Sequence, residues 1–219
     1  MKLKYNSIVA LIILFTVTCP SQIKKPLKLI PVDQSYKDNS LLKFKKEVFT
    51  AIDKKDTNFI ISILDTNILN SFGGNGGIKE FWEMWQMQDP NSSFWLELKK
   101  VFSMGGIFIS NERKIFVMPY LFGIWPEDLD PFTYIAAINK NVAIHESPSK
   151  NSKILKKINY DILLVLDYYD EYNNWKKVMT VDSLSGFVQK EFVRSPIDYR
   201  AILQKEKGKW KITSFVSGD

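Results

Sequence analysis

The spacing of apolar residues changes near residue 136, and this change constrains the fold more than any other feature of the sequence. Before it, apolar residues recur every three or four positions, as at Leu41, Phe44 and Val48, which is the spacing of an amphipathic helix. After it, short apolar runs such as 162–166 alternate with turn residues, which is typical of strands in a small β-fold. We therefore predict an α+β protein with two structural units of different kinds.

Residues 39–135 are expected to form most of the first unit. Asn39-Ser40 and Asp56 are helix-start signals that stand before periodic apolar stretches, and Ser92-Ser93 stands before another. We expect helices over residues 41–52, 57–64, 78–85 and 94–102, and strands over residues 68–72, 107–109 and 114–117. The aromatic, proline-broken stretch 119–126 is expected to pack as a buried loop, because aromatic side chains bury the most apolar surface.

A glycine-rich loop precedes the third expected helix, with glycines at 73, 74, 76 and 77. Such a loop before a helix often binds phosphate through backbone amides. This loop lacks the Gly-Lys-Ser/Thr ending of a phosphate loop and the spacing of a dinucleotide-binding loop. We therefore expect the glycines to allow a tight turn and close packing of Trp82 and Trp85.

The last part of the chain carries a β-hairpin signal. Residues 198–205 and 210–216 alternate between apolar and polar side chains, with Glu206-Lys207-Gly208-Lys209 as the turn between them. Because this hairpin follows the β-type segment, we expect residues 197–219 to complete a domain of helices and antiparallel sheet with residues 39–135. The β-type segment would then be inserted in that domain, and a domain appended to it is the alternative.

Residues 136–196 follow the course of a known family. Asn141-Val142-Ala143-Ile144 would be an opening strand, a Ser-Pro-Ser loop starts at Ser147, Trp175-Lys176-Lys177-Val178 would be a tryptophan strand, and Gly186-Phe187-Val188 a closing hairpin. This order resembles the bacterial SH3 (Src-homology-3) domains of cell-envelope proteins. The resemblance implies a small all-β barrel over residues 136–196 that binds cell-wall glycopeptide or peptide and catalyses no reaction.

The flanking segments resemble a second family. The final stretch from Gly208 to Val216 is similar to the closing strand of nuclear-transport-factor-2-like (SnoaL-like) α+β cones. In that family several helices pack against a curved antiparallel sheet. The resemblance implies that residues 39–135 and 197–219 form such a cone, with the SH3-like barrel between the two stretches.

An aromatic cluster in the β-type segment is the candidate ligand site. Tyr168, Tyr169, Tyr172 and Trp175 stand among acidic residues and asparagines. Aromatic rings with polar neighbours can stack on sugars or clamp a peptide, so these four are the expected ligand-binding residues. Two alternatives stay open: Trp175 could be a core residue of its strand, and the tyrosines could merely cover a loop.

The amino terminus predicts export. Lys2 and Lys4 precede the apolar run 8–15, and the chain turns polar after it, which is the pattern of a signal peptide over residues 1–18. The apolar run is well short of the roughly 20 residues that a spanning helix needs. Residues 19–38 contain three prolines and are expected to form an extended linker.

Cys19 follows directly after the expected signal peptide. The stretch Thr16-Val17-Thr18-Cys19 resembles the lipobox of bacterial lipoproteins, which implies that Cys19 becomes a lipidated first residue. Signal cleavage without lipidation and an uncleaved anchor are the alternatives. In each case we expect the protein in the periplasm or cell envelope, in contact with a membrane only through its amino terminus.

Few residues are available for catalysis or metal binding. One cysteine and one histidine exclude an internal disulfide framework and a thiolate- or histidine-rich metal site, so we expect no metal, no cofactor and no catalytic residues. The histidine, His145, or a neighbour of it stands in place of the arginine customary in SH3-like domains, and His145 is expected to be an ordinary surface or edge residue of its strand rather than a catalyst. The net charge of +6 is not gathered into a basic stripe, so nucleic acid is not an expected partner.

These observations predict an exported, non-enzymatic envelope protein whose SH3-like domain binds a cell-wall component such as peptidoglycan, or a peptide. The alternative is a small-molecule-binding or enzymatic protein that uses a cavity in the α+β cone. Acid–base catalysis in that cavity would need a carboxylate there. The candidates are Asp65, Asp198 and Asp219.

Overall fold

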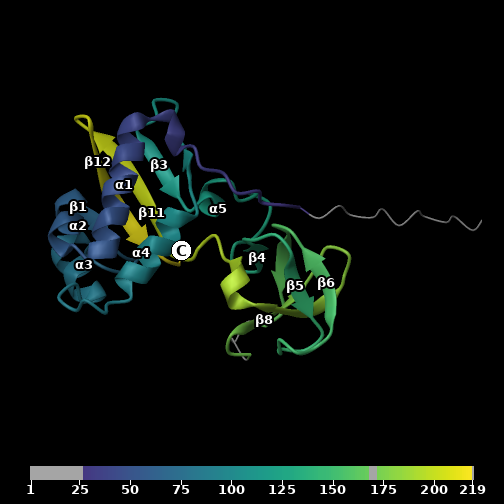
Figure 1. Ribbon diagram of the computed structural model, residues 1–219. Coiled ribbons are helices and arrows are strands. Elements are labelled where there is room, and N and C mark those ends of the chain that lie inside the picture. Colours follow the sequence, from purple (N-terminus) through teal and green to yellow (C-terminus); the bar gives the residue numbers. More distant parts are fainter. Residues whose placement is uncertain (1–26, 168–171, 219) are drawn as a thin grey trace, which may run out of the picture.

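The computed structural model describes residues 27–167 and 172–218, which form two lobes (Figure 1). The helical lobe consists of helices packed on a five-stranded sheet, and the β-rich lobe is built on a seven-stranded sheet. The chain is therefore α+β, as the change in apolar spacing predicted. The expected signal peptide and lipidation site Cys19 lie outside the described residues. Across the described part of the chain, no helix has both the length and the apolar character needed to cross a membrane.

The helical lobe is built from segments at both ends of the described chain. Its helices are η1 (Ser35–Lys37), α1 (Asn39–Lys54), α2 (Thr57–Ile63), α3 (Gly77–Trp85), α4 (Phe94–Ser103) and α5 (Tyr120–Gly123). Its strands are β1 (Leu64–Leu69), β2 (Ile107–Phe108), β3 (Ile115–Met118), β11 (Arg200–Glu206) and β12 (Lys209–Val216). The sheet has the order β1-β12-β11-β3-β2, in which β1 runs parallel to β12 and the other neighbours are antiparallel.

Aromatic side chains fill the space between α3, α4 and β12. Phe94 is fully buried, and its ring centroid lies 5.3 Å from that of Phe81 and 5.7 Å from that of Phe215, edge to face in both cases. Trp85 and Trp95 also pack against the Phe94 ring. Such pairs add a favourable geometry to the burial of large apolar surfaces, so this cluster is the centre of the helical lobe.

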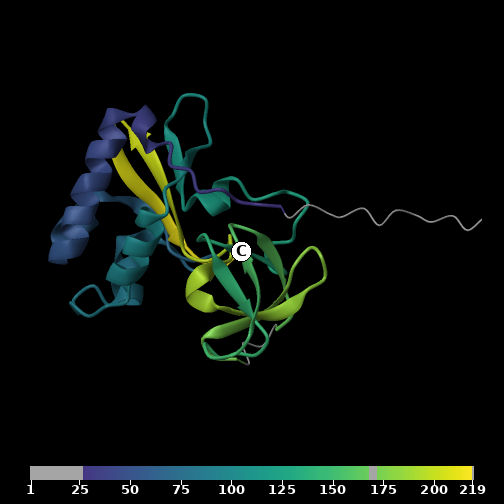
Figure 2. The same ribbon diagram turned by 45° about the vertical axis from the view of Figure 1, so that its right-hand side comes forward.

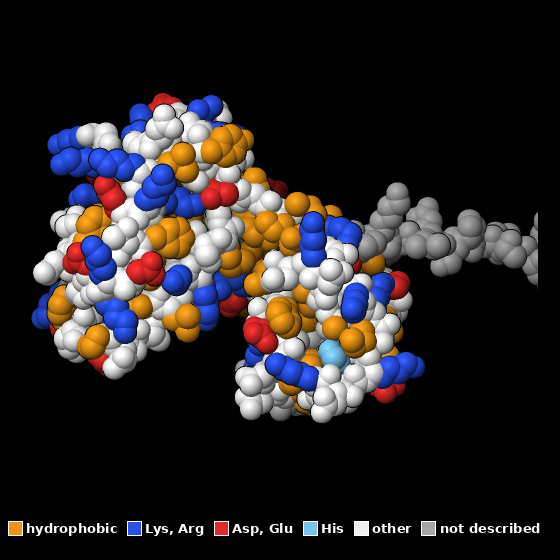
Figure 3. Space-filling view, in the orientation of Figure 1, with side chains coloured by type: hydrophobic (Ala, Val, Ile, Leu, Met, Phe, Trp, Pro, Cys, Tyr) orange, Lys and Arg blue, Asp and Glu red, His pale blue; other side chains and the backbone are white. Residues whose placement is uncertain are grey.

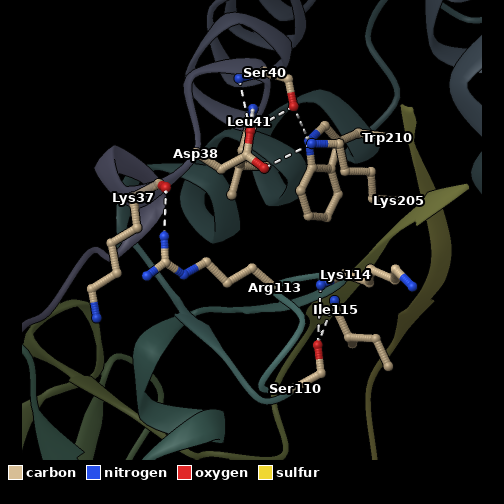
Figure 4. Close-up of polar contacts among 10 residues, drawn as sticks. All are labelled: Lys37, Asp38, Ser40, Leu41, Ser110, Arg113, Lys114, Ile115, Lys205 and Trp210. Atoms are coloured by element: carbon tan, nitrogen blue, oxygen red, sulfur yellow. Dashed lines mark hydrogen bonds and ion pairs between the residues drawn. The ribbon is translucent and has the colours of Figure 1, made fainter. Parts of the chain in front are cut away.

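Asp38 joins the start of α1 to the terminal hairpin (Figure 4). Its Oδ1 accepts hydrogen bonds from the backbone N–H groups of Ser40 at 2.8 Å and Leu41 at 3.0 Å, which is the arrangement of a helix N-cap. Its Oδ2 lies 2.8 Å from the Nζ of Lys205 on β11. The indole N–H of Trp210 on β12 donates to the Ser40 hydroxyl at 3.0 Å. One carboxylate therefore fixes the helix start and its position against the sheet.

The glycine-rich loop before α3 is closed by a carboxylate of the helix that follows it. Glu80 Oε2 accepts hydrogen bonds from the backbone N–H of Asn75 at 2.8 Å and of Gly76 at 3.2 Å. Gly76 and Gly77 have positive φ angles of 71° and 87°, which glycine adopts without strain. Glu80 thus occupies two amides of the loop, which agrees with a structural turn; of the two tryptophans expected to pack closely, Trp85 is buried and Trp82 is exposed.

The β-rich lobe lies in the sequence between α5 and β11. Its elements are β4 (Tyr134–Ala137), β5 (Val142–His145), β6 (Ile154–Ile158), β7 (Ile162–Val165), β8 (Trp175–Met179), β9 (Ser185–Gln189), η2 (Lys190–Phe192) and β10 (Val193–Arg194). The strands surround a common apolar core. Figure 2 shows the curled course of these strands from a second side. The sheet order is β10-β4-β7-β8-β9-β5-β6.

The sheet of the β-rich lobe is not a closed barrel, which differs from the expectation for residues 136–196. The described strands leave β10 and β6 as its two edges. The physical reason is that β10 contributes only two residue pairs, both to β4, while β6 pairs with β5 alone. The result is a curved open sheet rather than a cylinder of hydrogen bonds.

Residues 27–34, here called the strap, run along both lobes, whereas the sequence predicted an extended linker over 19–38. The backbone N–H of Leu29 donates to Tyr160 O at 2.8 Å, and that of Gln34 donates to Gly106 O at 2.8 Å. Lys28 Nζ lies 2.6 Å from an Asp161 carboxylate oxygen. The strap is held because its backbone groups find partners on both lobes and its apolar Leu29 is buried.

An apolar junction connects the lobes beneath the strap. Its buried members are Leu29, Tyr120, Leu121, Ala136 and Ile162. The Tyr120 hydroxyl donates to Leu29 O at 3.2 Å, and burial, with the neighbouring Tyr160, raises the pKa of Tyr120 to about 12. Of the aromatic stretch 119–126, which was expected to pack as a buried loop, residues 119–121 are buried and residues 122–126 are partly exposed, and its first turn is the helix α5.

Candidate ligand-binding site

Trp175 lies at the first position of β8 and borders a surface hollow on the β-rich lobe. The side chain is 8% exposed, and its ring lies 5.1 Å from the His145 ring, edge to face. The hollow has a volume of about 340 Å³. It is lined by Lys150, Asn174, Trp175, Gln189, Lys190 and Glu191. Trp175 therefore both packs in the lobe and forms part of a ligand-sized surface.

The tyrosines predicted to join Trp175 are placed differently. Tyr172 packs edge to face on Phe187 of β9, with ring centroids 4.9 Å apart, and is not among the residues that line the hollow. Tyr168 and Tyr169 lie outside the described residues. The polar rim of the hollow, which comes from Lys150, Gln189 and η2, carried no signal in the sequence because these residues are far apart along the chain.

His145 supports the tryptophan from the neighbouring strand. The imidazole is buried, and its Nδ1 lies 3.3 Å from Ser152 O in the loop after β5. Its ring contact with Trp175 fixes the indole from one side. His145 is therefore a buried packing residue of a strand that is paired on both sides, and the expectation of a surface or edge residue was wrong.

A larger cleft of about 750 Å³ separates the lobes. Figure 3 shows the indentation between the two bodies, with acidic and basic side chains at its rim. The cleft is lined by Trp85, Ser93, Glu97, Lys100, Ser103, Met104, Ile138, Lys190, Glu191, Val193, Arg194, Asp198, Tyr199 and Ser217. These residues come from α3, α4, η2, β10 and the loop before β11, so only the tertiary fold brings them together.

Arg194 is the buried cation of this cleft. The side chain is 9% exposed, and its Nη2 donates to Tyr199 O at 2.6 Å. Its Nε is buried and has no hydrogen-bond partner among the described residues. Burial lowers the pKa of Arg194, and the nearby carboxylates of Asp198 and Glu97 oppose that effect. The cleft therefore holds a guanidinium whose hydrogen-bonding capacity is only partly used.

The charges that line the cleft are balanced. Glu97, Glu191 and Asp198 face the three cations Lys100, Lys190 and Arg194. Lys100 Nζ lies 2.6 Å from Glu97 Oε1, and one oxygen of the exposed Asp198 accepts from the backbone N–H of Ser195 at 3.1 Å. The cleft thus offers both signs of charge above an aromatic wall formed by Trp85 and Tyr199, whose ring centroids lie 4.9 Å apart.

The hollow and the cleft share a border. Lys190 and Glu191 line both, and the backbone N–H of Lys190 donates to Asn174 O at 2.9 Å, which fixes η2 beside the start of β8. A ligand longer than the hollow would pass over η2 toward the cleft.

Of the three carboxylates considered for catalysis, the structure describes two, and these lie on different elements. Asp65 lies on β1, where it accepts a hydrogen bond from the backbone N–H of Asn67 at 2.8 Å. Asp198 lies in the cleft, and Asp219 is outside the described residues. Within residues 27–167 and 172–218, no group of three or more His, Cys, Asp and Glu side chains is arranged to hold a metal ion.

Comparison with known proteins finds no family model that matches the chain, no similar curated protein and no similar solved structure. The function is therefore argued from the hollow and the cleft themselves.

Proposed function

We propose that the protein is an exported, non-enzymatic binding protein of the cell envelope whose β-rich lobe acts as an SH3-like module that grips a wall glycopeptide or an extended peptide. The observation that carries the proposal is the hollow beside Trp175, where an indole lies next to amide, lysine and glutamate side chains. Only the edge of the largely buried indole borders the hollow, and the polar groups beside it suit the hydroxyl groups of a sugar or the backbone of a peptide.

The strand pattern supports the SH3-like part of the proposal. Trp175 opens a strand that is followed by the β9 strand with Gly186, in the order that the resemblance implies. A Cβ at Gly186 would come within 2.5 Å of Ile144 Cγ2 and 2.7 Å of His145 O. A larger residue at this position would force β9 and β5 apart, so Gly186 allows the close approach of the two strands.

Export and anchoring are the remaining parts of the proposal. They are supported by the basic start, the apolar run 8–15 and the lipobox-like stretch that ends at Cys19. With this arrangement the strap would lead directly from an anchored amino terminus to the junction between the lobes.

Retention of the full chain on purified cell-wall sacculi tests the proposal. We expect the double variant Lys150→Ala/Asn174→Ala to be retained about fivefold less than the unchanged protein, because each truncation removes a polar contact at the edge of the hollow worth about 0.5 kcal/mol or more. Both residues are exposed, so the fold should tolerate the changes.

The matched control is Lys54→Ala/Asn58→Ala, which removes the same two residue types from exposed positions on α1 and α2. This control should be retained like the unchanged protein. Equal retention of both double variants, or no retention of the unchanged protein, would rule out wall binding through the hollow.

A further inference from the structure

Two buried donors in the cleft between the lobes lack acceptors. Arg194 Nε and Trp85 Nε1 are both buried without a hydrogen-bond partner among the described residues. Guanidinium and indole nitrogens can only donate, so neither group can be satisfied by another donor. Leaving a buried donor unpaired costs about 1–3 kcal/mol. Both atoms are closed to solvent, so a ligand supplies an acceptor to them only if the side chains around them move. Arg194 and Trp85 both contact Tyr199, so the two donors belong to one region of the cleft.

The charges of the cleft balance and Glu97 pairs with Lys100, but the carboxylates beside Arg194 favour a ligand that also carries a positive charge. Asp198 and Glu97 lie close enough to Arg194 to raise its pKa against the effect of burial, and with Glu191 they equal the three cations in number. A purely anionic ligand would be attracted by the guanidinium of Arg194 but repelled by these carboxylates. A ligand with one charge of each sign would complement both.

We propose that the cleft between the lobes binds a zwitterionic peptide unit, with its carboxylate at Arg194 and its ammonium group at Asp198 and Glu97. The apolar part of the unit would lie on the wall of Trp85 and Tyr199. The volume of about 750 Å³ is within the range of about 300–1,000 Å³ that is usual for small-molecule sites, and a short peptide fits it.

This inference goes beyond the proposed wall binding and does not depend on it. The hollow beside Trp175 is lined by residues of the β-rich lobe alone, whereas the cleft is lined by residues of both lobes. A ligand that occupies both would pass over Lys190 and Glu191, and each site can still be tested without the other.

Titration of the full chain with tri-alanine, followed by calorimetry, tests the inference. We expect saturable binding of tri-alanine. Its N-acetylated form lacks the ammonium group and its carboxamide form lacks the carboxylate, and each should bind at least about tenfold more weakly, because a charge-assisted hydrogen bond is worth roughly 1.5–3 kcal/mol.

Two variants test which residue of the cleft binds the carboxylate of the peptide and which binds its ammonium group. Arg194→Gln should weaken the binding of tri-alanine and of the N-acetylated form about tenfold. The binding of the carboxamide form should be unchanged, because that form has no carboxylate for Arg194 to bind. Asp198→Asn should weaken the binding of tri-alanine and of the carboxamide form about tenfold, and leave the binding of the N-acetylated form unchanged, because that form has no ammonium group. Asp198 is exposed, so this second variant is expected to fold even if Arg194→Gln does not.

Arg113→Gln is the matched control, since this exposed arginine bonds Lys37 O in the helical lobe and does not line the cleft. It should bind all three peptides like the unchanged protein. The Lys150→Ala/Asn174→Ala variant should also bind them normally, so a failure of wall binding would leave this result intact. Absence of saturable tri-alanine binding, or equal affinities for the three peptides, would overturn the inference.

Discussion

Phe94→Ala is expected to lower the free energy of unfolding by about 3–5 kcal/mol, the usual cost of removing a fully buried aromatic ring. The ring contacts Phe81, Trp85, Trp95 and Phe215, and a small side chain would leave a cavity among these rigid neighbours. Urea denaturation followed by circular dichroism measures the change.

Leu96→Ala on the same helix is the control for Phe94→Ala. Leu96 is 59% exposed, so its truncation should change the free energy of unfolding by about 0.5 kcal/mol or less. If the two variants were equally stable, the aromatic cluster would not be the centre of the helical lobe.

Asp38→Ala is expected to lower the free energy of unfolding by about 2–3 kcal/mol at neutral pH, because it removes a helix cap and the partner of Lys205 together. Burial by itself would raise the pKa of Asp38, but hydrogen bonds from Lys205, Ser40 and Leu41 outweigh this and hold the pKa at about 2. The carboxyl group is 15% exposed, so the pair is only partly screened by solvent.

The lowered pKa gives the effect of Asp38 a defined pH dependence. A carboxyl group with a pKa of about 2 in the folded state and 3.8 as its ordinary value stabilises the fold above pH 4 by about 2 kcal/mol, and this contribution is lost as the pH falls toward 2. The stability difference between the unchanged protein and Asp38→Asn should therefore shrink over this pH range. The pKa values of Asp33 and Asp182 are also lowered. Both residues are present in the unchanged protein and in the variant, so their contributions to the pH dependence cancel when the two free energies of unfolding are subtracted.

Asp53→Ala is the control for both Asp38 experiments. Asp53 lies on the same helix and pairs with Lys99, but both side chains are more than half exposed. Its removal should cost about 0.5 kcal/mol or less, since exposed ion pairs contribute little. An Asp38 variant that behaved like Asp53→Ala, or a stability difference independent of pH, would contradict the capping role.

The helices and the terminal hairpin could be predicted because their signals are local. The helix expected over residues 41–52 is α1, which begins two residues earlier, and the capping side chain is Asp38, whose second partner Lys205 is distant in sequence. The first strand was predicted over 68–72, but β1 covers Leu64–Leu69, because its position is set by parallel pairing with β12. Pairing of this kind leaves no trace in a local apolar pattern.

The site could be predicted only in part. Trp175 was identifiable because an aromatic residue among polar neighbours is conspicuous in the sequence. The cleft was missed because Trp85, Arg194 and Tyr199 meet only after the β-rich lobe folds back on α3 and α4. The strap was missed for a similar reason, since its hydrogen bonds to Tyr160 and Gly106 join it to distant parts of the chain.

The most direct test of the account is a titration of the ¹⁵N-labelled full chain with soluble wall fragments, observed by nuclear magnetic resonance. The indole N–H signal of Trp175, assigned with the variant Trp175→Phe, should shift and saturate together with the backbone signals of Asn174 and residues 189–191. Unchanged signals at these positions, or saturating shifts confined to α1 and α2, would contradict a ligand-binding hollow on the β-rich lobe.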